Sequence, residues 1–355
     1  MDDNWHPCCP PATGLVAPVR RWAEGREGPS AGRVRGPGFL AVSRGWHVPA
    51  DTPRTPEQRA FEVGCLLPTS GMLTGWAALR LAGASYFEGV EPDRRTPLPV
   101  PVLLPHARRL RGPAVVVART RRELPDPIVR YGVRCAPNDV ALLHEIRRAS
   151  SARAAGVMVD MALAAGVVER PVLRGLVRDV RLPAHATYAL GRACAECRSP
   201  RESAMLQVWE SVAGLPRPLM NREVRDLSGR LLAVVDLLDV DAGVCGEFNG
   251  SAHRSARRQS RDEKRHADLR AVGLETFAVV GSDSDDVQVE RMHAARGRAL
   301  WLPGSERRWR VGAFVPAPPL APVDTEEAER EVIMLEHYAA LEDRRSGEPS
   351  SPRSR

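Results

Sequence analysis

Residues 199–280 carry the clearest succession of secondary-structure patterns in the chain, and this succession limits the fold most. The segment opens as an amphipathic helix, with Ser199 at the N-cap, Pro200 in the first turn and apolar residues on one face. Three alternating apolar runs then predict strands, with turns at Ser228-Gly229 and Ala242-Gly243. The strands are expected near residues 220–225, 231–238 and 243–248.

A second helix and a fourth strand extend this pattern. A basic helix is predicted from residue 254 to 272, where Gly273 ends it. The apolar run ETFAVVG predicts a strand buried within the sheet, and a further helix follows. The order αβββαβ therefore predicts an α+β fold for this part of the chain.

Two acidic residues interrupt the apolar strands. Asp236 lies late in the second predicted strand and Glu247 in the third. Antiparallel pairing across a tight turn brings their carboxylates together if both face the same side of the sheet. Glu202, on the first helix, is positioned to supply a third acid. Converging carboxylates can hold Mg²⁺ or Mn²⁺, which activates water and neutralises the leaving oxygen in phosphodiester cleavage.

Each of these features also has a structural interpretation. Ser199 and Glu202 fit the S-x-x-E capping box, and Asp236 fits a surface acid near a turn. The basic helix has seven basic and three acidic residues from Arg254 to Arg270, which suits either a phosphate backbone or a solvated helix face. The candidate DNA contacts on this helix are Arg257, Arg258, Arg261, Lys264 and Arg265.

Residues 199–298 contain the motifs PRES, LPRPLMN, VVDLL, GEFNGSAH and GLETFAVV, together with an RD-x-x-R run formed by Arg261, Asp262 and Arg265. In this order the motifs closely resemble a domain of unknown function related to very-short-patch repair endonucleases. The resemblance implies a restriction-endonuclease-like fold of the PD-(D/E)XK superfamily. It also implies Asp236 and Glu247 as metal ligands, Glu202 as a supporting acid, and further pocket residues at His253, Asp262 and Arg265.

Asn249 departs from the pattern of that superfamily. The general pattern has Lys two residues after the second acid, and relatives of this subgroup often have Asp there. An amide can coordinate a metal through its carbonyl, or orient water, but it brings no charge. Loss of one preorganised electrostatic group typically lowers the rate on the order of a hundredfold to a thousandfold. Asn249 is thus a fourth candidate catalytic residue, with Lys264 as a substitute cation on the next helix, and whether the site cuts stays open.

The first half of the chain predicts a mixed α and β middle domain. GFLAVSRGWHVPA predicts a β-hairpin, TPEQRAFE and GWAALRLAG predict helices, and short β-like runs follow at PVPVLLP, AVVVA and IVRYGV. Further helices are expected at residues 139–148, 154–165 and 171–180. SRGWHVPA, TPEQRAFE, LTGWAALRLAGA and CAPNDVALLHEIRR resemble the amino-terminal region of AbiEi-like antitoxins, as found in many actinobacterial proteins. The resemblance implies a winged helix, but the Pro-rich residues 1–38 hardly supply its helices, so a degenerate form is expected.

These observations predict four segments. Residues 1–50 are a partly irregular winged-helix remnant, and residues 51–190 are an AbiEi-like mixed α/β domain. Residues 191–315 form the restriction-endonuclease-like domain. Residues 316–355 contain a Pro-rich linker, an acidic helix and a disordered tail.

Charge and cysteine content narrow the environment and the partners. The formal charge of +7 favours a polyanionic partner such as DNA. No run approaches the roughly 20 apolar residues that cross a bilayer, so we expect a cytoplasmic protein without a membrane partner. Seven scattered cysteines do not form a disulfide framework, and the CxxC of Cys194 and Cys197 lacks the two further ligands of a structural zinc site.

Three functions from different classes are compatible with this sequence. The first is a Mg²⁺-dependent DNA endonuclease in DNA repair or phage defence. The second is a non-catalytic, antitoxin-like transcriptional regulator, which keeps the nuclease fold, binds DNA and has a cognate toxin as partner. The third is a protein-interaction module, for which the acidic stretch near the carboxy terminus is the only sign.

Overall fold

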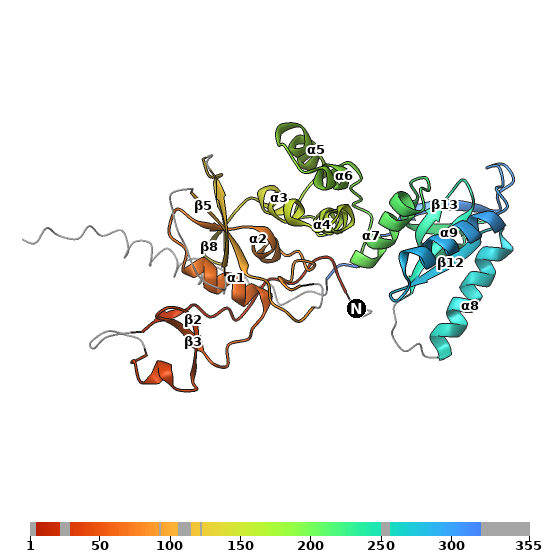
Figure 1. Ribbon diagram of the computed structural model, residues 1–355. Helices are drawn as coiled ribbons and strands as arrows, with labels where there is room; N and C mark the ends of the chain where they lie inside the picture. Colours follow the sequence, from red (N-terminus) through yellow and green to blue (C-terminus); the bar gives the residue numbers. More distant parts are fainter. Residues whose placement is uncertain are drawn as a thin grey trace, which may run out of the picture. The chain divides into compact units, whose positions relative to one another are not determined.

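Figure 1 shows a computed structural model of the chain. The structure describes residues 5–21, 29–91, 94–105, 115–120, 123–249 and 256–320, without the side chains of residues 176, 177, 179 and 256–262. The described residues fall into two compact units. The amino-terminal unit comprises residues 9–145 with Leu320, and the carboxy-terminal unit comprises residues 5–8 and 146–319.

A small antiparallel sheet begins the amino-terminal unit. Its strands are β1 (Val19–Arg20), β2 (Phe39–Ser43) and β3 (Trp46–Pro49), in the order β1-β3-β2. The predicted hairpin is confirmed, since β2 and β3 pair across a turn at Arg44 and Gly45. Gly45 adopts a φ of +81°, a conformation that glycine reaches without strain. Among the residues described ahead of β2, the helical segment is the single 3₁₀ turn η1 (Arg33–Arg35).

A second sheet forms the core of the same unit. Its order is β6-β5-β4-β8-β7, from β4 (Met72–Leu73), β5 (Val100–Pro105), β6 (Val115–Thr120), β7 (Ile128–Arg130) and β8 (Val133–Cys135). Helices α1 (Pro56–Cys65) and α2 (Gly75–Leu81) pack beside it, which confirms a mixed α and β unit. The single β-like run predicted at IVRYGV is instead a hairpin. Tyr131 and Gly132 both adopt positive φ values, which turns the chain back on itself.

The carboxy-terminal unit starts with a group of helices. After α3 (Asn138–Arg148), these are α4 (Ala152–Ala164), α5 (Arg170–Asp179), α6 (Ala184–Gly191) and α7 (Pro200–Gln207). Helix α6 was not predicted. Helix α4 packs against both α6 and α7. Helices α4 to α6 thus share a compact unit with the following sheet, whereas the sequence pattern predicts one domain over residues 51–190.

Asp160 of α4 is a fully buried acid in this helical layer. Its Oδ1 accepts a hydrogen bond from the Cys194 backbone N–H at 2.6 Å, and its Oδ2 accepts one from the Ser203 hydroxyl at 2.6 Å. Burial, with a smaller contribution from Cys194, raises the pKa of Asp160 from its ordinary value of 3.8 to about 8. The folded protein therefore keeps a proton on Asp160 at pH values where the unfolded chain releases it.

We expect Asp160→Asn to remove a pH dependence of stability. Between pH 4 and pH 8 the folded state binds the proton and the unfolded state does not, so stability falls as pH rises and levels off above the folded pKa. The slope reaches about 1.4 kcal/mol per pH unit. Urea unfolding from pH 5 to 9, under reducing conditions, should show a flatter profile for the variant. The exposed Asp241→Asn is the control, and an unchanged slope in Asp160→Asn would contradict the assignment.

A five-stranded sheet follows the helices. Its strands are β9 (Leu219–Asp226), β10 (Leu231–Asp239), β11 (Val244–Asn249), β12 (Glu275–Val280) and β13 (Trp309–Phe314), in the order β12-β11-β10-β9-β13. Only β11 and β12 pair in parallel, and α8 (Ala256–Ala271) lies between them in sequence. Helix α9 (Asp285–Arg298) follows β12. The predicted element order and the α+β class are confirmed, whereas β13 was not predicted.

None of the helices in the described ranges is long and apolar enough to cross a bilayer.

Helices pack on both faces of this sheet. On one face Cys245 of β11 shares an apolar core with Leu269 of α8. On the other face Gly246 leaves room for the ring of Phe277. That ring stacks on Trp209 of η2 (Val208–Val212), the π-helical turn that continues α7, with 5.9 Å between ring centroids. Successive residues of β11 therefore face α8 and α7 in alternation.

Candidate functional site

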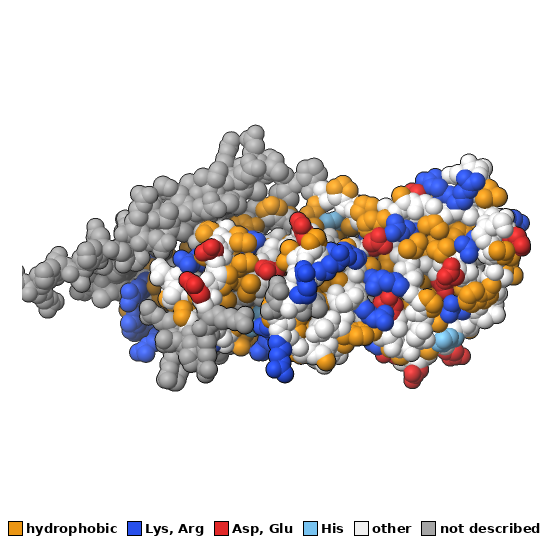
Figure 2. Space-filling view, turned by 90° about the horizontal axis from the view of Figure 1, so that it is seen from above, with side chains coloured by type: hydrophobic (Ala, Val, Ile, Leu, Met, Phe, Trp, Pro, Cys, Tyr) orange, Lys and Arg blue, Asp and Glu red, His pale blue; other side chains and the backbone are white. Residues whose placement is uncertain are grey.

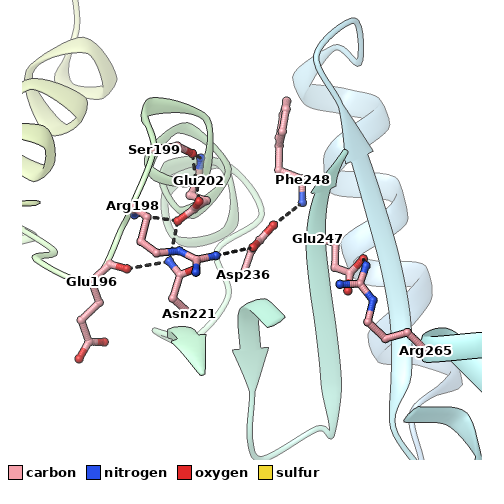
Figure 3. A network of polar contacts seen from close by, with 9 residues as sticks. All are labelled: Glu196, Arg198, Ser199, Glu202, Asn221, Asp236, Glu247, Phe248 and Arg265. Carbon is pink, nitrogen blue, oxygen red and sulfur yellow. Dashed lines mark hydrogen bonds and ion pairs between the residues drawn. The ribbon is translucent and has the colours of Figure 1, made fainter. Parts of the chain in front are cut away.

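Strands β10 and β11 part at the predicted acids. Their pairing runs from Asp239↔Val244 to Leu237↔Gly246, while β11 stays paired with β12 as far as Asn249. Beyond the last pair, the Phe248 backbone N–H donates to the Asp236 carboxylate, at 2.9 Å from Oδ2. The acid thus takes the place of a strand carbonyl where the two strands open, as Figure 3 shows.

Glu202 lies beside this opening, held by donors from three residues. The Ser199 side chain caps α7 by accepting from the Glu202 N–H at 3.2 Å, and its hydroxyl donates to Glu202 Oε1 at 3.1 Å. Glu202 Oε2 accepts from the Arg198 backbone N–H at 2.8 Å and from Asn221 Nδ2 at 2.5 Å. The predicted N-cap is confirmed. The Glu202 carboxylate reaches back past the N-cap, so it supports the helix start as well as lying near Asp236.

Arg198 and Asn221 join the two acids into one network. The Arg198 guanidinium lies 3.5 Å from Asp236 Oδ1. Asn221 is fully buried, adopts a φ of +51° and uses Nδ2 for the carbonyl of Glu196 as well as for Glu202. Asn is one of the few residues that enter this left-handed region readily. Neither residue was singled out from the sequence, although Arg198 directly precedes the N-cap and Asn221 ends the LPRPLMN motif.

Glu247 belongs to a different set of contacts. It follows Cys245 by two residues on β11 and therefore faces α8. The Arg265 guanidinium lies 2.6 Å from Glu247 Oε2, and His266 Nε2 lies 3.2 Å from the same oxygen. Figure 3 shows the Glu247 side chain pointing toward Arg265 and away from Asp236. The structure thus brings Glu202 and Asp236 together and places Glu247 in a neighbouring ion pair.

The three acids nevertheless interact through their charges. Burial, followed by the negative charges of Glu202 and Glu247, raises the pKa of Asp236 to about 7, while the Phe248 N–H and Arg198 act in the opposite direction. Asp236 therefore gains and loses its proton near neutral pH. The positive charge of the neighbouring arginines does not fully offset the negative charges around Asp236. An additional cation would therefore be stabilised beside this carboxyl group.

The oxygen donors of these acids are of the type that a hard divalent cation prefers. Their present arrangement, however, is not that of a metal site. Carboxylate oxygens are the ligands that Mg²⁺ and Mn²⁺ prefer, and Glu247 Oε1 is buried and has no hydrogen-bond partner among the side chains that the structure describes. The oxygens of Glu202 and Asp236, in contrast, already accept from N–H or O–H donors. Within the described part of the chain, no three His, Cys, Asp or Glu side chains lie close enough together to hold one metal ion. A shared ion would require Glu247 to leave Arg265.

The remaining predicted residues are placed only in part. Asn249 is the half-buried last residue of β11, Lys264 is exposed on α8, and Arg265 is the partner of Glu247. On the face shown in Figure 2, basic side chains form several separate groups with acidic ones between them. His253 lies outside the described residues. The side chains of four further predicted residues are also not described, namely Arg257, Arg258, Arg261 and Asp262.

No protein-family model, no curated protein and no solved structure matches this chain. The relationships to very-short-patch repair endonucleases and to AbiEi-like antitoxins, inferred from motifs, stay predictions.

Proposed function

We propose that the carboxy-terminal unit is a DNA-interacting domain of the PD-(D/E)XK type that cleaves phosphodiester bonds weakly with Mg²⁺ or Mn²⁺, in DNA repair or phage defence. The observation that carries this proposal is the opening of the β10–β11 ladder at Asp236. Glu202 and Glu247 lie within electrostatic range of that opening. Two carboxylates able to hold a divalent cation, Asp236 and Glu247, with Glu202 as a supporting acid, could supply the donor set for such hydrolysis.

The side chains of the site have separate roles in this proposal. Asp236 and Glu247 would hold the cation, which supplies water activation and neutralises the leaving oxygen when bound. Glu202, fixed by Ser199 and Asn221, stabilises the arrangement around Arg198. Arg198 keeps the Asp236 carboxylate oriented. Asn249 contributes an uncharged amide at the end of β11, which is why we expect cleavage to be weak.

DNA binding in this proposal depends on the basic helix. Lys264 is exposed on α8, and Arg257, Arg258 and Arg261 precede it in the same helix. Backbone contacts of this kind position a duplex without reading its sequence, and they weaken as salt concentration rises. The formal charge of +7 is consistent with a polyanionic partner.

Nicking of supercoiled plasmid in Mn²⁺ tests the proposal. We expect Asp236→Ala and Glu247→Ala to lower the nicking rate by at least about a hundredfold, because each removes a carboxylate that would hold the cation needed to stabilise the developing negative charge. Asn249→Lys should raise the rate, since an ammonium near the scissile phosphate stabilises negative charge. Thermal unfolding with and without Mn²⁺ measures metal binding separately, and stabilisation should be absent from Asp236→Ala.

Glu223→Gln is the matched control, because Glu223 is an acid of the same sheet that pairs with Arg225 at 2.9 Å. Its nicking rate and its Mn²⁺ response should equal those of the unmodified protein. Equal Mn²⁺ stabilisation of Asp236→Ala and the unmodified protein would place the metal elsewhere. Absence of nicking in every protein, with duplex binding retained in a gel-shift assay, would reject the nuclease proposal.

The second candidate is a non-catalytic, antitoxin-like regulator that binds DNA and a cognate toxin. One observation favours it: the carboxylates of the site already have protein partners, namely Arg198 and Phe248 for Asp236, and Arg265 and His266 for Glu247. Such pairs can serve as structural supports of an inactive scaffold. The gel-shift outcome described above is the result that this candidate predicts.

A further inference from the structure

Arg201 is a half-buried residue of α7 that directly precedes Glu202. Its guanidinium lies over an aromatic ring, with the guanidinium carbon 5.2 Å from the centre of the Phe248 ring. Within the described part of the chain, no carboxylate forms an ion pair with this guanidinium. A cation that is partly withdrawn from water and lacks a counter-charge is a favourable partner for an external anion.

The other two arginines of the site differ from Arg201 in this respect. The Arg198 guanidinium lies 3.5 Å from Asp236, and the Arg265 guanidinium lies 2.6 Å from Glu247. Binding an anion through either of them would take positive charge away from an acid that is paired with it. Of these three arginines, Arg201 is therefore the one that can bind an anion without breaking an ion pair.

Phe248 connects Arg201 to the opening between β10 and β11. Its backbone N–H donates to Asp236 at 2.9 Å, and its ring carries the Arg201 guanidinium. Because side chains alternate along β11 and Glu247 faces α8, Phe248 faces α7. Figure 3 shows the Phe248 ring pointing away from Glu247. The guanidinium therefore lies on the α7 side of the opening, one residue away from the carboxylate of Asp236.

Gly281, which follows β12, fixes the position of the guanidinium from a second side. A Cβ atom at this glycine would lie 2.6 Å from Arg201 Nη1 and 3.2 Å from its Cζ, so the guanidinium fills the space of a side chain. Gly281 is exposed and does not adopt a positive φ, so its backbone conformation does not itself require glycine. The ring and the bare backbone hold the guanidinium in one place, which lowers the entropic cost of binding a ligand.

We propose that Arg201 binds a backbone phosphate of DNA at the opening beside Asp236. This inference rests on the proposed function, because its ligand is the nucleic acid on which the domain would act. The Phe248 ring covers one face of the planar guanidinium, whereas the N–H donors point outward within its plane. Those donors can form two parallel hydrogen bonds to phosphate oxygens. Such a contact positions a strand near the carboxylates without reading its sequence.

Binding of a short fluorescein-labelled duplex, measured by fluorescence anisotropy in EDTA over a series of NaCl concentrations, tests this inference. The EDTA separates binding from cleavage. We expect Arg201→Gln to raise Kd on the order of tenfold at low salt and to make the slope of log Kd against log salt shallower by about 0.9, as for one lost phosphate contact. Arg201→Lys should keep the slope but raise Kd about threefold, because an ammonium cannot form two parallel bonds.

Gly281→Ala tests the positioning without removing the arginine. Its methyl group would displace the guanidinium, so we expect Kd to approach that of Arg201→Gln. Gly304→Ala is the matched control, since nothing lies within 4 Å of the Cβ atom that it would gain. Arg310→Gln controls for net charge, because it removes an exposed cation from β13, at the opposite edge of the sheet from β12. Both controls should bind the duplex as the unmodified protein does.

The possible results separate this inference from the proposed function. Equal weakening in Arg201→Gln and Arg310→Gln would assign the effect to net charge and overturn the inference. So would an unchanged Kd and salt slope in Arg201→Gln, and if Mn²⁺-dependent nicking persists, the nuclease proposal is retained. Weaker binding in Arg201→Gln and Gly281→Ala, with no nicking by any protein, would support the phosphate contact and reject the nuclease. Circular dichroism checks that each variant is folded.

Discussion

Replacing Arg265 by methionine is expected to lower the free energy of unfolding on the order of 3 kcal/mol. The change removes the guanidinium that lies 2.6 Å from Glu247 and leaves a buried carboxylate whose nearest remaining partner among the described side chains is His266, at 3.2 Å. Methionine keeps most of the apolar stem, so the loss measures the missing charge rather than missing volume. Urea unfolding followed by circular dichroism measures the difference.

A second substitution distinguishes a charge effect from a packing effect. Arg265→Met with Glu247→Gln should recover most of the lost stability, because the buried charge is gone. Arg270→Met is the matched control, since Arg270 is exposed on the same helix, and we expect a change within about 0.5 kcal/mol. Equal losses in Arg265→Met and Arg270→Met would contradict the ion-pair interpretation.

The same variants report on the proposed metal site. If Glu247 is a metal ligand once Arg265 no longer holds it, Mn²⁺ should stabilise Arg265→Met more than the unmodified protein. That gain should disappear when Glu247→Gln is added. Equal stabilisation by Mn²⁺ of Arg265→Met with and without Glu247→Gln would exclude this carboxylate from the proposed site.

Trp209→Ala is expected to have the largest effect on stability, a loss of about 4 kcal/mol. The indole is fully buried, stacks on Phe277 and donates its Nε1–H to the carbonyl of Pro216 at 2.6 Å. The substitution removes this packing between η2 and β12 and leaves a cavity that the surrounding sheet can fill only in part. Urea unfolding of the full chain, followed by circular dichroism, provides the measurement.

Two further variants, Trp209→Phe and Trp301→Ala, serve as comparisons, and both should lose less stability than Trp209→Ala. The phenyl ring keeps stacking on Phe277 but cannot donate to Pro216, so we expect an intermediate loss. Trp301 is half exposed, and its removal should lower stability by about 1 kcal/mol or less. Comparable losses in Trp209→Ala and Trp301→Ala would mean that the π-helical turn does not anchor this sheet.

The parts of the fold that could be predicted are those whose signals are local. Helix α7 begins where Ser199 and Pro200 indicate, and β10 starts at the predicted Leu231, because caps, turns and alternation lie within a few residues. Strand β13 was missed because its partner β9 lies far away in sequence. Hairpin β7–β8 was read as one run because the turn at Tyr131 and Gly132 lacks the usual Asn-Gly signal.

The candidate site could be predicted in composition but not in arrangement. Asp236 and Glu247 were expected to converge because they lie on neighbouring antiparallel strands. Which neighbour each carboxylate takes depends on how α8 packs, and the contact of Leu269 with Cys245 puts Arg265 and His266 beside Glu247. The role of Asn221 depends on a backbone conformation, φ +51°, that a single sequence does not reveal.

Strand β13 also bears on how the chain avoids aggregation while it is being synthesised. Strand β9 is made long before β13, so one edge of β9 stays open until the last strand arrives. Open edges are templates for pairing with other chains, and charged side chains along an edge discourage such pairing. Four of the eight residues of β9 are charged, namely Arg222, Glu223, Arg225 and Asp226. We therefore expect these charges to discourage pairing with other chains during that interval, and β13 covers the edge afterwards.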